Sequence, residues 1–391
     1  MKYDNFYGGN VPLDGLGFLG TPVDDRVLSD EHLASAYTEA RAIAELMDRL
    51  DFDTLWLAEH HFQHEGHGSI PNIPMLAVYL AQHTERLNFG AWFNTVPAWH
   101  PLRLAEEFAM ADVLTGGRMR FGVGRGYIAR EVETLGAPLN DDQANRELFE
   151  EQLAVLFKAF GQRSFSHRGK HYDLPARVQF RGRDLEEITL VPRPLRQPVE
   201  VWQPIQSGTE RAFDIMAAHG IKGVVLGGTR AGGRADTAAA KYRDALARAG
   251  RDVELGEDMA ISVIIHLADT IEKAIEEVTP YQQEVVKVTA PLGRIPHLTP
   301  EQVLAANDPS EALQAGLPTI QEGIDEGTWI CGPPEHVIER IIDLQARLPG
   351  LERLSIGAGG LGIPPAVIRD DIEWFATEVM PALRKAAAAV G

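Results

Sequence analysis

Residues 54–64 read Thr-Leu-Trp-Leu-Ala-Glu-His-His-Phe-Gln-His, and this stretch decides how the rest of the chain is interpreted. A short apolar run that starts at Leu55 stops abruptly at Glu59, His60 and His61. A continuous apolar run of this length is typical of a strand buried on both faces. Because three titratable side chains follow it directly, we expect the strand to end at a pocket. The other strands are then expected to build the walls of that pocket.

Comparable apolar runs recur along the chain and alternate with amphipathic helical patterns. The first helical stripe runs from Leu33 to Leu50 after Ser29-Asp30, two residues that suit the start of a helix. Later helices are predicted near Pro74, over 101–113, 141–160, 207–220, 235–249 and 337–348, and from Pro365 onward. The predicted strands are 16–20, 55–58, 87–93, 119–124, 199–202, 222–226, 260–266 and 353–357.

This alternation predicts the fold class. Strands that alternate with helices form a parallel sheet, because each helical crossover returns the chain to the same edge. Eight such units suit closure into a (β/α)8 TIM barrel, whose active sites lie at the C-terminal ends of the strands. No stretch has the composition of a linker, so we predict one domain over residues 1–391. An open doubly wound sheet is the alternative.

Two segments depart from the alternation. Residues 162–198 follow the fourth helix. Within them, residues 164–180 are predicted to form a hairpin that leaves the barrel, and a cluster of prolines then leads the chain back to the sheet. Residues 279–328 follow the seventh strand and are rich in Pro, Gly and polar side chains, which predicts a long irregular insertion. A loop of that length inside a compact domain indicates function or disorder.

Composition limits the possible partners and locations. The 37 basic and 56 acidic side chains give a net charge of −19, which argues against binding to nucleic acid or to anionic membranes. A single cysteine, Cys331, excludes an intramolecular disulfide and a cysteine-rich metal site. The N-terminus lacks the apolar core of a signal peptide, and no stretch approaches the roughly 18 apolar residues of a membrane span. We therefore expect a cytoplasmic protein.

The strand that ends at Glu59 would place His60 and His61 at the catalytic face of a barrel. Histidine supplies a base near neutral pH, although an isolated histidine is more often structural. Because adjacent strand residues point to opposite faces, the two histidines should not share a role. One is expected to face the barrel mouth, and the other to pack or bond behind it.

A metal site is the competing interpretation of this stretch, because His60, His61, His64 and His67 form a visible cluster. His60 and His64 have the spacing of ligands on one helix face, but the glycines around His67 argue against a helix there. A metal-dependent hydrolase is therefore the weaker alternative, and no metal ligand is predicted.

A second group of residues suggests an anion site. The run 121–127, Phe-Gly-Val-Gly-Arg-Gly-Tyr, places Arg125 at a strand end among glycines, although its spacing is not the dinucleotide-binding fingerprint. Ser207-Gly208-Thr209-Glu210 opens a helix and reads as a capping box with Ser207 as the N-cap. Such a helix start also suits a phosphate. Together they predict a phosphorylated cofactor between the fourth and fifth strands.

Three runs resemble the bacterial luciferase-like flavin monooxygenases in order and spacing: LWLAEHHF at 55–62, NFGAWFNTVPAWHPLRLAEE at 88–107 and LTGGRMRFGVGRGY at 114–127. The resemblance is close over about residues 12–160 and looser beyond. It implies a (β/α)8 barrel that uses reduced FMN with O2 as co-substrate, a separate flavin reductase as partner, and a homodimer. It also implies that the insertion 279–328 can act as a lid.

The resemblance assigns roles to individual residues. His60 matches the catalytic histidine of the family, which supports formation or reaction of a flavin C4a-hydroperoxide. A non-proline cis peptide is implied at Trp92–Phe93, close to the flavin ring, and a second phosphate-binding arginine at the start of the fourth helix. The implied cofactor-binding residues are Trp92, Asn94, Arg125, Gly126, Arg146, Ser207, Gly208 and Thr209.

The predicted function is oxygenation of a small or medium organic substrate, such as an aldehyde or a ketone, by way of a C4a-peroxyflavin. Gly124 stands where luciferase has a cysteine, Gln203 and Gln206 where it has an acidic residue, and Trp92 is bulkier than expected. These departures argue against light emission and long-chain aldehydes. The closest alternative is an F420-dependent hydride-transfer oxidoreductase on the same barrel. A non-catalytic subunit is disfavoured, because both His60 and Arg125 are present.

Overall fold

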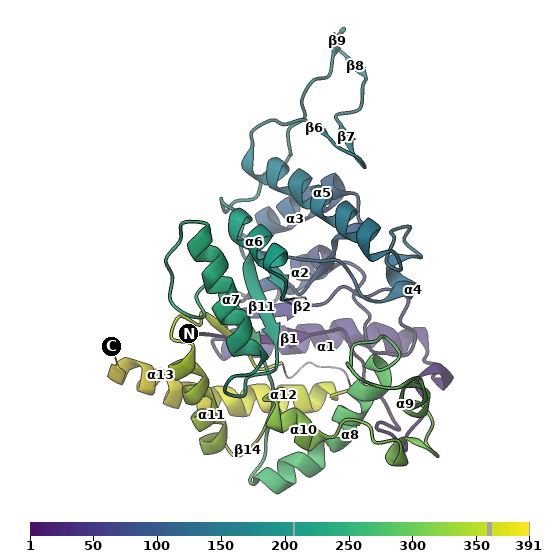
Figure 1. Cartoon of the computed structure of the whole chain (residues 1–391), viewed down its shortest axis with the longest axis vertical. Coiled ribbons are helices and arrows are strands. Elements are labelled where there is room, and N and C mark those ends of the chain that lie inside the picture. Colours follow the sequence, from purple (N-terminus) through teal and green to yellow (C-terminus); the bar gives the residue numbers. More distant parts are fainter. Residues whose placement is uncertain (206–207, 358–361, 391) are drawn as a thin grey trace.

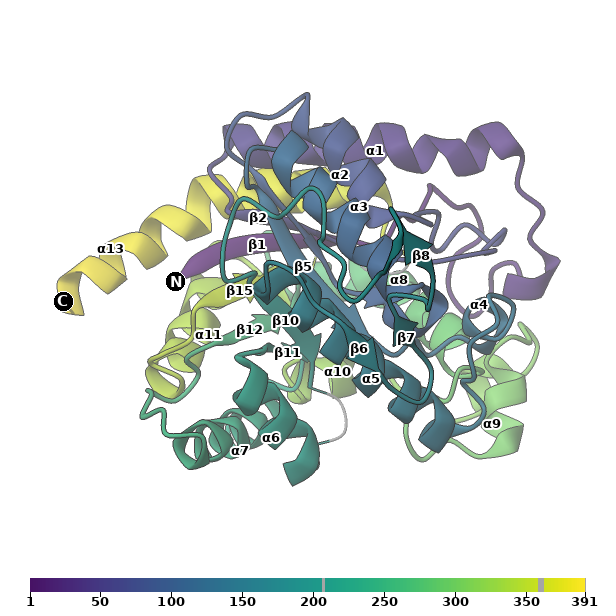
Figure 2. The ribbon, with the colours of Figure 1, turned by 90° about the horizontal axis from the view of Figure 1, so that it is seen from above.

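The computed structural model describes residues 1–205, 208–357 and 362–390, with side chains up to residue 387. A closed barrel of parallel strands lies at its centre, surrounded by helices (Figures 1 and 2). The strands, in their order around the barrel, are β1 (Lys2–Tyr7), β2 (Thr54–Leu57), β3 (Asn88–Ala91), β5 (Met119–Gly124), β10 (Val201–Pro204), β11 (Lys222–Leu226), β12 (Met259–Ser262) and β15 (Arg353–Ser355). Pairing of β15 with β1 closes the ring and confirms the (β/α)8 prediction.

The helices between the strands bury one apolar stripe each against the barrel. In α1, for example, the side chains of Ala36, Ala40, Ile43 and Met47 are buried, and Ser29 caps the helix by accepting the His32 N–H. The helices of the outer layer are α1 (Asp30–Arg49), α2 (Ile73–Ala81), α3 (Pro101–Leu114), α5 (Asp142–Gly161), α6 (Glu210–His219), α7 (Arg234–Arg248), α11 (Pro334–Arg347) and α12 (Pro365–Trp374). A π-helical turn, η4 (Phe375–Val379), joins α12 to α13 (Met380–Val390).

The prediction of the first strand was wrong. Residues 16–20 lie in a loop, and the first strand is the segment Lys-Tyr-Asp-Asn-Phe-Tyr of β1. Asp4 is fully buried within β1, where it accepts hydrogen bonds from Arg353 and from the Trp56 indole. The ion pair inside the barrel compensates the burial of the carboxylate, so the strand does not need an apolar sequence.

The region after the seventh strand is more regular than predicted. Helix α8 (Ile271–Thr289) runs through Pro280 because one face, including Ala274 and Val278, is buried against the barrel. It is followed by α9 (Pro300–Ala305), the 3₁₀ turn η3 (Ala312–Gln314), α10 (Ile320–Asp325) and β14 (Trp329–Gly332). Strand β14 pairs in parallel with β13 (Ile264–Leu267), an extension of the seventh strand. Thus packing, rather than helix propensity, decides the structure of residues 279–289.

The excursion after α5 forms an arm that projects beyond this helix, at the top of Figure 1. It contains two short antiparallel pairs, β6 (His167–Arg168) with β7 (Asp173–Leu174), and β8 (Gln179–Phe180) with β9 (Arg183–Asp184). The predicted hairpin is therefore present, and a second one follows it. Across the ranges that the structure describes, no helix combines the length and apolarity needed to cross a bilayer.

Aromatic side chains fill the barrel interior. Trp56 stacks on Trp92 with ring centroids 4.5 Å apart, and its edge meets Trp202 at 5.6 Å. Gly90 on the neighbouring strand makes room for this stack, because a Cβ there would lie 2.1 Å from the Trp56 ring. The stack therefore forms a solid floor below the C-terminal ends of the strands.

Candidate active site

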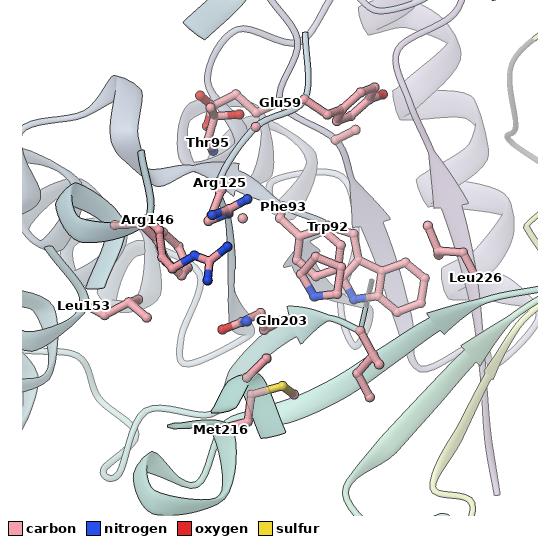
Figure 3. A pocket seen from close by; sticks show the side chains of 18 of the residues that line it. Glu59, Trp92, Phe93, Thr95, Arg125, Arg146, Leu153, Gln203, Met216 and Leu226 are labelled. Carbon is pink, nitrogen blue, oxygen red and sulfur yellow. The ribbon is translucent and has the colours of Figure 1, made fainter. Parts of the chain in front are cut away.

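A cavity of about 650 Å³ opens at the C-terminal ends of the barrel strands. Its volume lies within the range typical of small-molecule and cofactor sites, roughly 300–1,000 Å³. The segments after β2, β3 and β5 supply one side of its wall, and β10, α5 and α6 supply the other. Figure 3 shows Trp92 and Phe93 side by side in this wall, near the two arginines at positions 125 and 146.

His60 lies in the cavity wall and is held on several sides. Its side chain is 10% exposed, and its backbone N–H donates to the carbonyl of Ile70. Gly68 packs against the imidazole, where a Cβ would lie within 2.8 Å of three His60 atoms. The Nδ1 atom of His60 lies 3.1 Å from a carboxylate oxygen of Glu131. The ring therefore has one defined orientation.

Glu131 determines which nitrogen of His60 carries the proton. This residue belongs to the short helix α4 (Ala129–Val132) and also accepts the His61 N–H at 3.0 Å and the Gln63 amide at 2.7 Å. Burial opposes ionisation, but the hydrogen bonds from His60, from Gln63 and from the His61 backbone lower the pKa of Glu131 below its usual range. An ionised carboxylate only accepts hydrogen bonds, so Nδ1 of His60 donates and Nε2 is the basic atom.

His61 has a different environment from His60, although both lie in the loop after β2 rather than in the strand. Its Nε2 lies 3.0 Å from Glu59, whose oxygens also accept the Trp99 indole N–H and the Thr95 backbone N–H. Burial lowers the pKa of His61, but the hydrogen bond and charge of Glu59 outweigh it and raise the pKa. Glu59 thus reaches the cavity wall with its oxygens already occupied, and this pair stabilises the loop rather than facing a ligand.

The other two histidines of the sequence cluster point elsewhere. His67 is buried between Arg26 and Glu284, and the side chain of His64 is 61% exposed beside Glu65. Within the described part of the chain, no group of three or more His, Cys, Asp or Glu residues is placed to hold a metal ion. The four histidines of the sequence cluster therefore contact different partners.

Two arginines of the cavity wall meet at one carboxylate, Asp142, which is exposed and does not itself line the cavity. Arg125 follows β5, Arg146 lies in the second turn of α5, and both line the cavity. Their Nη2 atoms lie 2.6 and 2.7 Å from the two oxygens of Asp142. Gly126 turns the chain with φ +77°, and a Cβ there would lie 2.4 Å from Val132. The two guanidinium groups can together donate hydrogen bonds to one phosphate.

Helix α6 begins at the same end of the cavity. Gly208 (φ +55°) and Thr209 line the wall, and Thr209 is the N-cap, accepting the Ala212 N–H. The prediction of Ser207 as the N-cap was wrong, because the helix starts two residues later. Ser207 itself lies outside the described residues. Free N–H groups at a helix start favour an anion.

A family model described as luciferase-like monooxygenase matches residues 18–349, most of the chain. The chain belongs to this family. Among its relatives, 4-hydroxyprotoasukamycin monooxygenase of Streptomyces nodosus subsp. asukaensis is 26% identical over 344 residues, 87% of this chain and 85% of the relative.

Solved structures share the fold of this luciferase-like chain. The oxygenating constituent of 3,6-diketocamphane monooxygenase from Pseudomonas putida, a type II Baeyer-Villiger monooxygenase solved with FMN, superposes with a TM-score of 0.70 at 18% identity, over 97% of this chain and 98% of that one. An F420-dependent secondary alcohol dehydrogenase gives 0.67 at 15% identity, over 98% and 99%. The shared fold alone thus accommodates both kinds of cofactor.

In this luciferase-like barrel, Trp92 lines the cavity, whereas Asn94, which was also predicted to bind the cofactor, does not. The Trp92–Phe93 peptide is cis, as the resemblance implied, and both side chains line the cavity. Asn94 begins β4 (Asn94–Thr95), and its amide donates to the Gly122 carbonyl at 2.7 Å. It is absent from the cavity wall, because β4 pairs with β5 and turns it toward that strand.

Sequence reasoning missed several residues of the site. Glu131 lies 71 positions from His60 in a helix of one turn, and Asp142 beside Arg146 looks like an ordinary surface ion pair. Arg211 in the first turn of α6 pairs with Glu150, and both line the cavity. Only the charged character of the α6 start could have suggested Arg211.

Proposed function

We propose that this chain is a monooxygenase that uses reduced FMN and O2 to oxygenate a small or medium organic substrate. One observation carries the proposal: a single cavity holds a histidine of fixed tautomer, His60, and a pair of arginines, Arg125 and Arg146. A base and a phosphate anchor in one enclosed space suit a phosphorylated redox cofactor better than a metal or a simple hydrolytic site. The family membership of the chain supports the same assignment.

The donor set of the cavity fits a flavin mononucleotide. Arg125, Arg146 and the start of α6 offer charged and backbone donors to a phosphate. Trp92 and Phe93 offer a flat apolar wall to a ring system. The Trp92 indole N–H and the Gln203 side-chain oxygen are buried without a hydrogen-bond partner among the described residues, and both belong to residues that line the cavity. They can bond the polar edges of a flavin.

The residues of the cavity would then have distinct roles in the reaction. Bound reduced flavin supplies the electrons that activate O2. His60 accepts or returns a proton at Nε2, while Glu131 keeps Nδ1 protonated and the ring in place. The aromatic wall excludes water, so that proton transfer is restricted to His60.

The substrate class follows from the shape of the floor. Trp92 occupies space that a smaller residue would leave open, which favours a compact aldehyde or ketone, oxygenated by insertion or hydroxylation. A separate flavin reductase would supply the reduced cofactor. We also propose that the chain folds as one domain, forms a homodimer and is located in the cytoplasm.

The decisive experiment supplies reduced FMN or reduced F420 to the pure protein in air, with a panel of ketones and aldehydes. We expect reduced FMN to bind, and one substrate class to suppress hydrogen peroxide release and to incorporate labelled oxygen from ¹⁸O2. If reduced FMN oxidises at its free-solution rate with every substrate, the proposal fails. Consumption of F420 without O2 uptake would instead establish hydride transfer.

A further inference from the structure

Helix α5 supplies one of the cavity arginines, Arg146, and the carboxylates that pair with three of them. Asp142, Arg146 and Glu150 follow one another at intervals of four residues and therefore share one helix face. Asp142 contacts Arg125 with one oxygen and Arg146 with the other, whereas Glu150 holds Arg211 through contacts of 2.9 and 2.7 Å. Each of these three cavity arginines is thus paired with a carboxylate of α5.

We infer that Asp142 is an intramolecular counterion that pairs with the two arginines of the anion subsite until a phosphate monoester takes its place. The inference rests on the proposed function only in assigning that phosphate to a cofactor. Asp142 thereby sets how tightly the cofactor binds and which anions can compete. This assigns Asp142 a role in selectivity rather than in chemistry.

Charge and geometry explain the selectivity. The Asp142 carboxylate brings one negative charge and one oxygen to each guanidinium group. A phosphate monoester brings nearly two charges at neutral pH and three terminal oxygens, enough to bond both arginines. A phosphodiester or a carboxylate brings only one charge, so it gains little when it displaces Asp142. The subsite should therefore prefer a dianionic phosphate monoester.

The surroundings show that Asp142 can leave without disrupting the site. Its side chain is 63% exposed, and it is the first residue of α5, where the helix N-terminus stabilises a free carboxylate. The Arg125 backbone is held independently, because the buried amide of Asn145 donates to its carbonyl at 3.3 Å. A residue whose purpose was to position the arginines would be expected to be buried and fixed.

The test compares Asp142→Asn with the wild-type protein. The amide keeps the shape of the side chain but removes its charge. Asp214→Asn is the matched control, because Asp214 holds Arg248 at 2.6 Å in an exposed pair outside the cavity wall. Dissociation constants for oxidised FMN and for riboflavin, which lacks the phosphate, are measured by calorimetry at low ionic strength.

We expect Asp142→Asn to bind FMN about 3- to 10-fold more tightly, the range that two partly exposed ion pairs can account for. The affinity of Asp142→Asn for riboflavin should not change. The affinities of the control Asp214→Asn for both ligands should equal those of the wild type. Weaker FMN binding by Asp142→Asn would show that Asp142 positions the arginines. An equal gain in affinity for riboflavin would show that the phosphate is not what competes with Asp142. Either result overturns the inference.

Inorganic phosphate and dimethyl phosphate separate this inference from the proposed function. Each is added to both proteins, and the shift in unfolding temperature is recorded. Greater protection of Asp142→Asn by inorganic phosphate, with little effect of dimethyl phosphate, supports the counterion even if FMN fails to bind. The absence of any phosphate protection in either protein contradicts it.

Discussion

Glu131 holds Nδ1 of His60 at 3.1 Å although the two residues lie 71 positions apart in the sequence. The contact joins the loop after β2 to the short helix after β5, two barrel strands that are separated by β3, so segments from both strands fix one imidazole. A second link is the His61 backbone N–H, which donates to the same carboxylate oxygen. The geometry of the base therefore depends on a carboxylate from a distant part of the sequence, which also lines the cavity.

Replacement of Glu131 by Gln should reduce coupled turnover by about 10- to 100-fold, the usual cost of losing a carboxylate that orients a functional histidine. An amide can donate as well as accept, so the Nδ1 proton of His60 is no longer specified. The ¹⁵N chemical shifts of His60 should change from a single tautomer to a mixture, while FMN affinity stays the same. Glu339→Gln, on the exposed face of α11, is the control. An unchanged tautomer would remove Glu131 from this role.

Replacement of Gly68 by Ala tests the orientation of the ring from the other side. The added methyl group would lie within 2.8 Å of His60, so the imidazole must move away from its present position. We expect more hydrogen peroxide per reduced FMN consumed, and at least a tenfold loss of product, with FMN affinity unchanged. Gly161→Ala has open space around its Cβ and should be neutral or slightly stabilising. Normal coupling in Gly68→Ala would show that the ring position is not critical.

Replacement of Arg125 or Arg146 by Ala should weaken FMN binding by about 10- to 100-fold, because each loses a charge-assisted hydrogen bond to phosphate. Riboflavin should bind as before. Calorimetric titrations of the two ligands measure the difference. Equal losses for FMN and riboflavin would indicate that the arginines support the cavity wall rather than the phosphate.

A buried charge cluster should make stability depend on pH. Burial opposes ionisation of Glu284, but hydrogen bonds from His67 and Arg26 lower its pKa from 4.5 to about 2. Because the folded value is depressed, the stabilisation is present above pH 4.5 and is lost as the pH falls toward 2. The ionised Glu284 thus contributes roughly 3 kcal/mol to the free energy of unfolding.

Replacement of Glu284 by Gln should therefore cost about 3–5 kcal/mol at pH 7, since Arg26 and Lys287 stay buried without their counter-charge. The difference in the free energy of unfolding between variant and wild type should become smaller as the pH is lowered from 5 to 3. Urea unfolding at several pH values measures it, with exposed Glu373→Gln as the control. A gap independent of pH would contradict the assigned ionisation.

The fold followed from the sequence wherever local pattern and burial agree. The apolar runs of β5 and β11 were predicted with their observed bounds. Strand β1 was missed because Asp4 is buried through an ion pair with Arg353, a residue 349 positions away. No local pattern carries such information.

A position in the cavity wall was predictable for residues close to a strand end, such as Arg125, directly after β5, and His60, three residues after the end of β2. The roles of Glu131 and Asp142 were not predictable, because their importance arises only when the barrel closes and brings β2, β5 and α5 together. Asn94 does not line the cavity, because the chain resumes pairing with β5 immediately after the cis peptide.

The tryptophan stack has a practical consequence. Three of the six tryptophans, Trp56, Trp92 and Trp202, form one chain of ring contacts that ends in the cavity wall. Indole emission is quenched by a chromophore at van der Waals distance, and excitation passes readily between rings so close together. The protein thus carries an optical reporter of cavity occupation, and filling and emptying of the site can be followed in real time without any label.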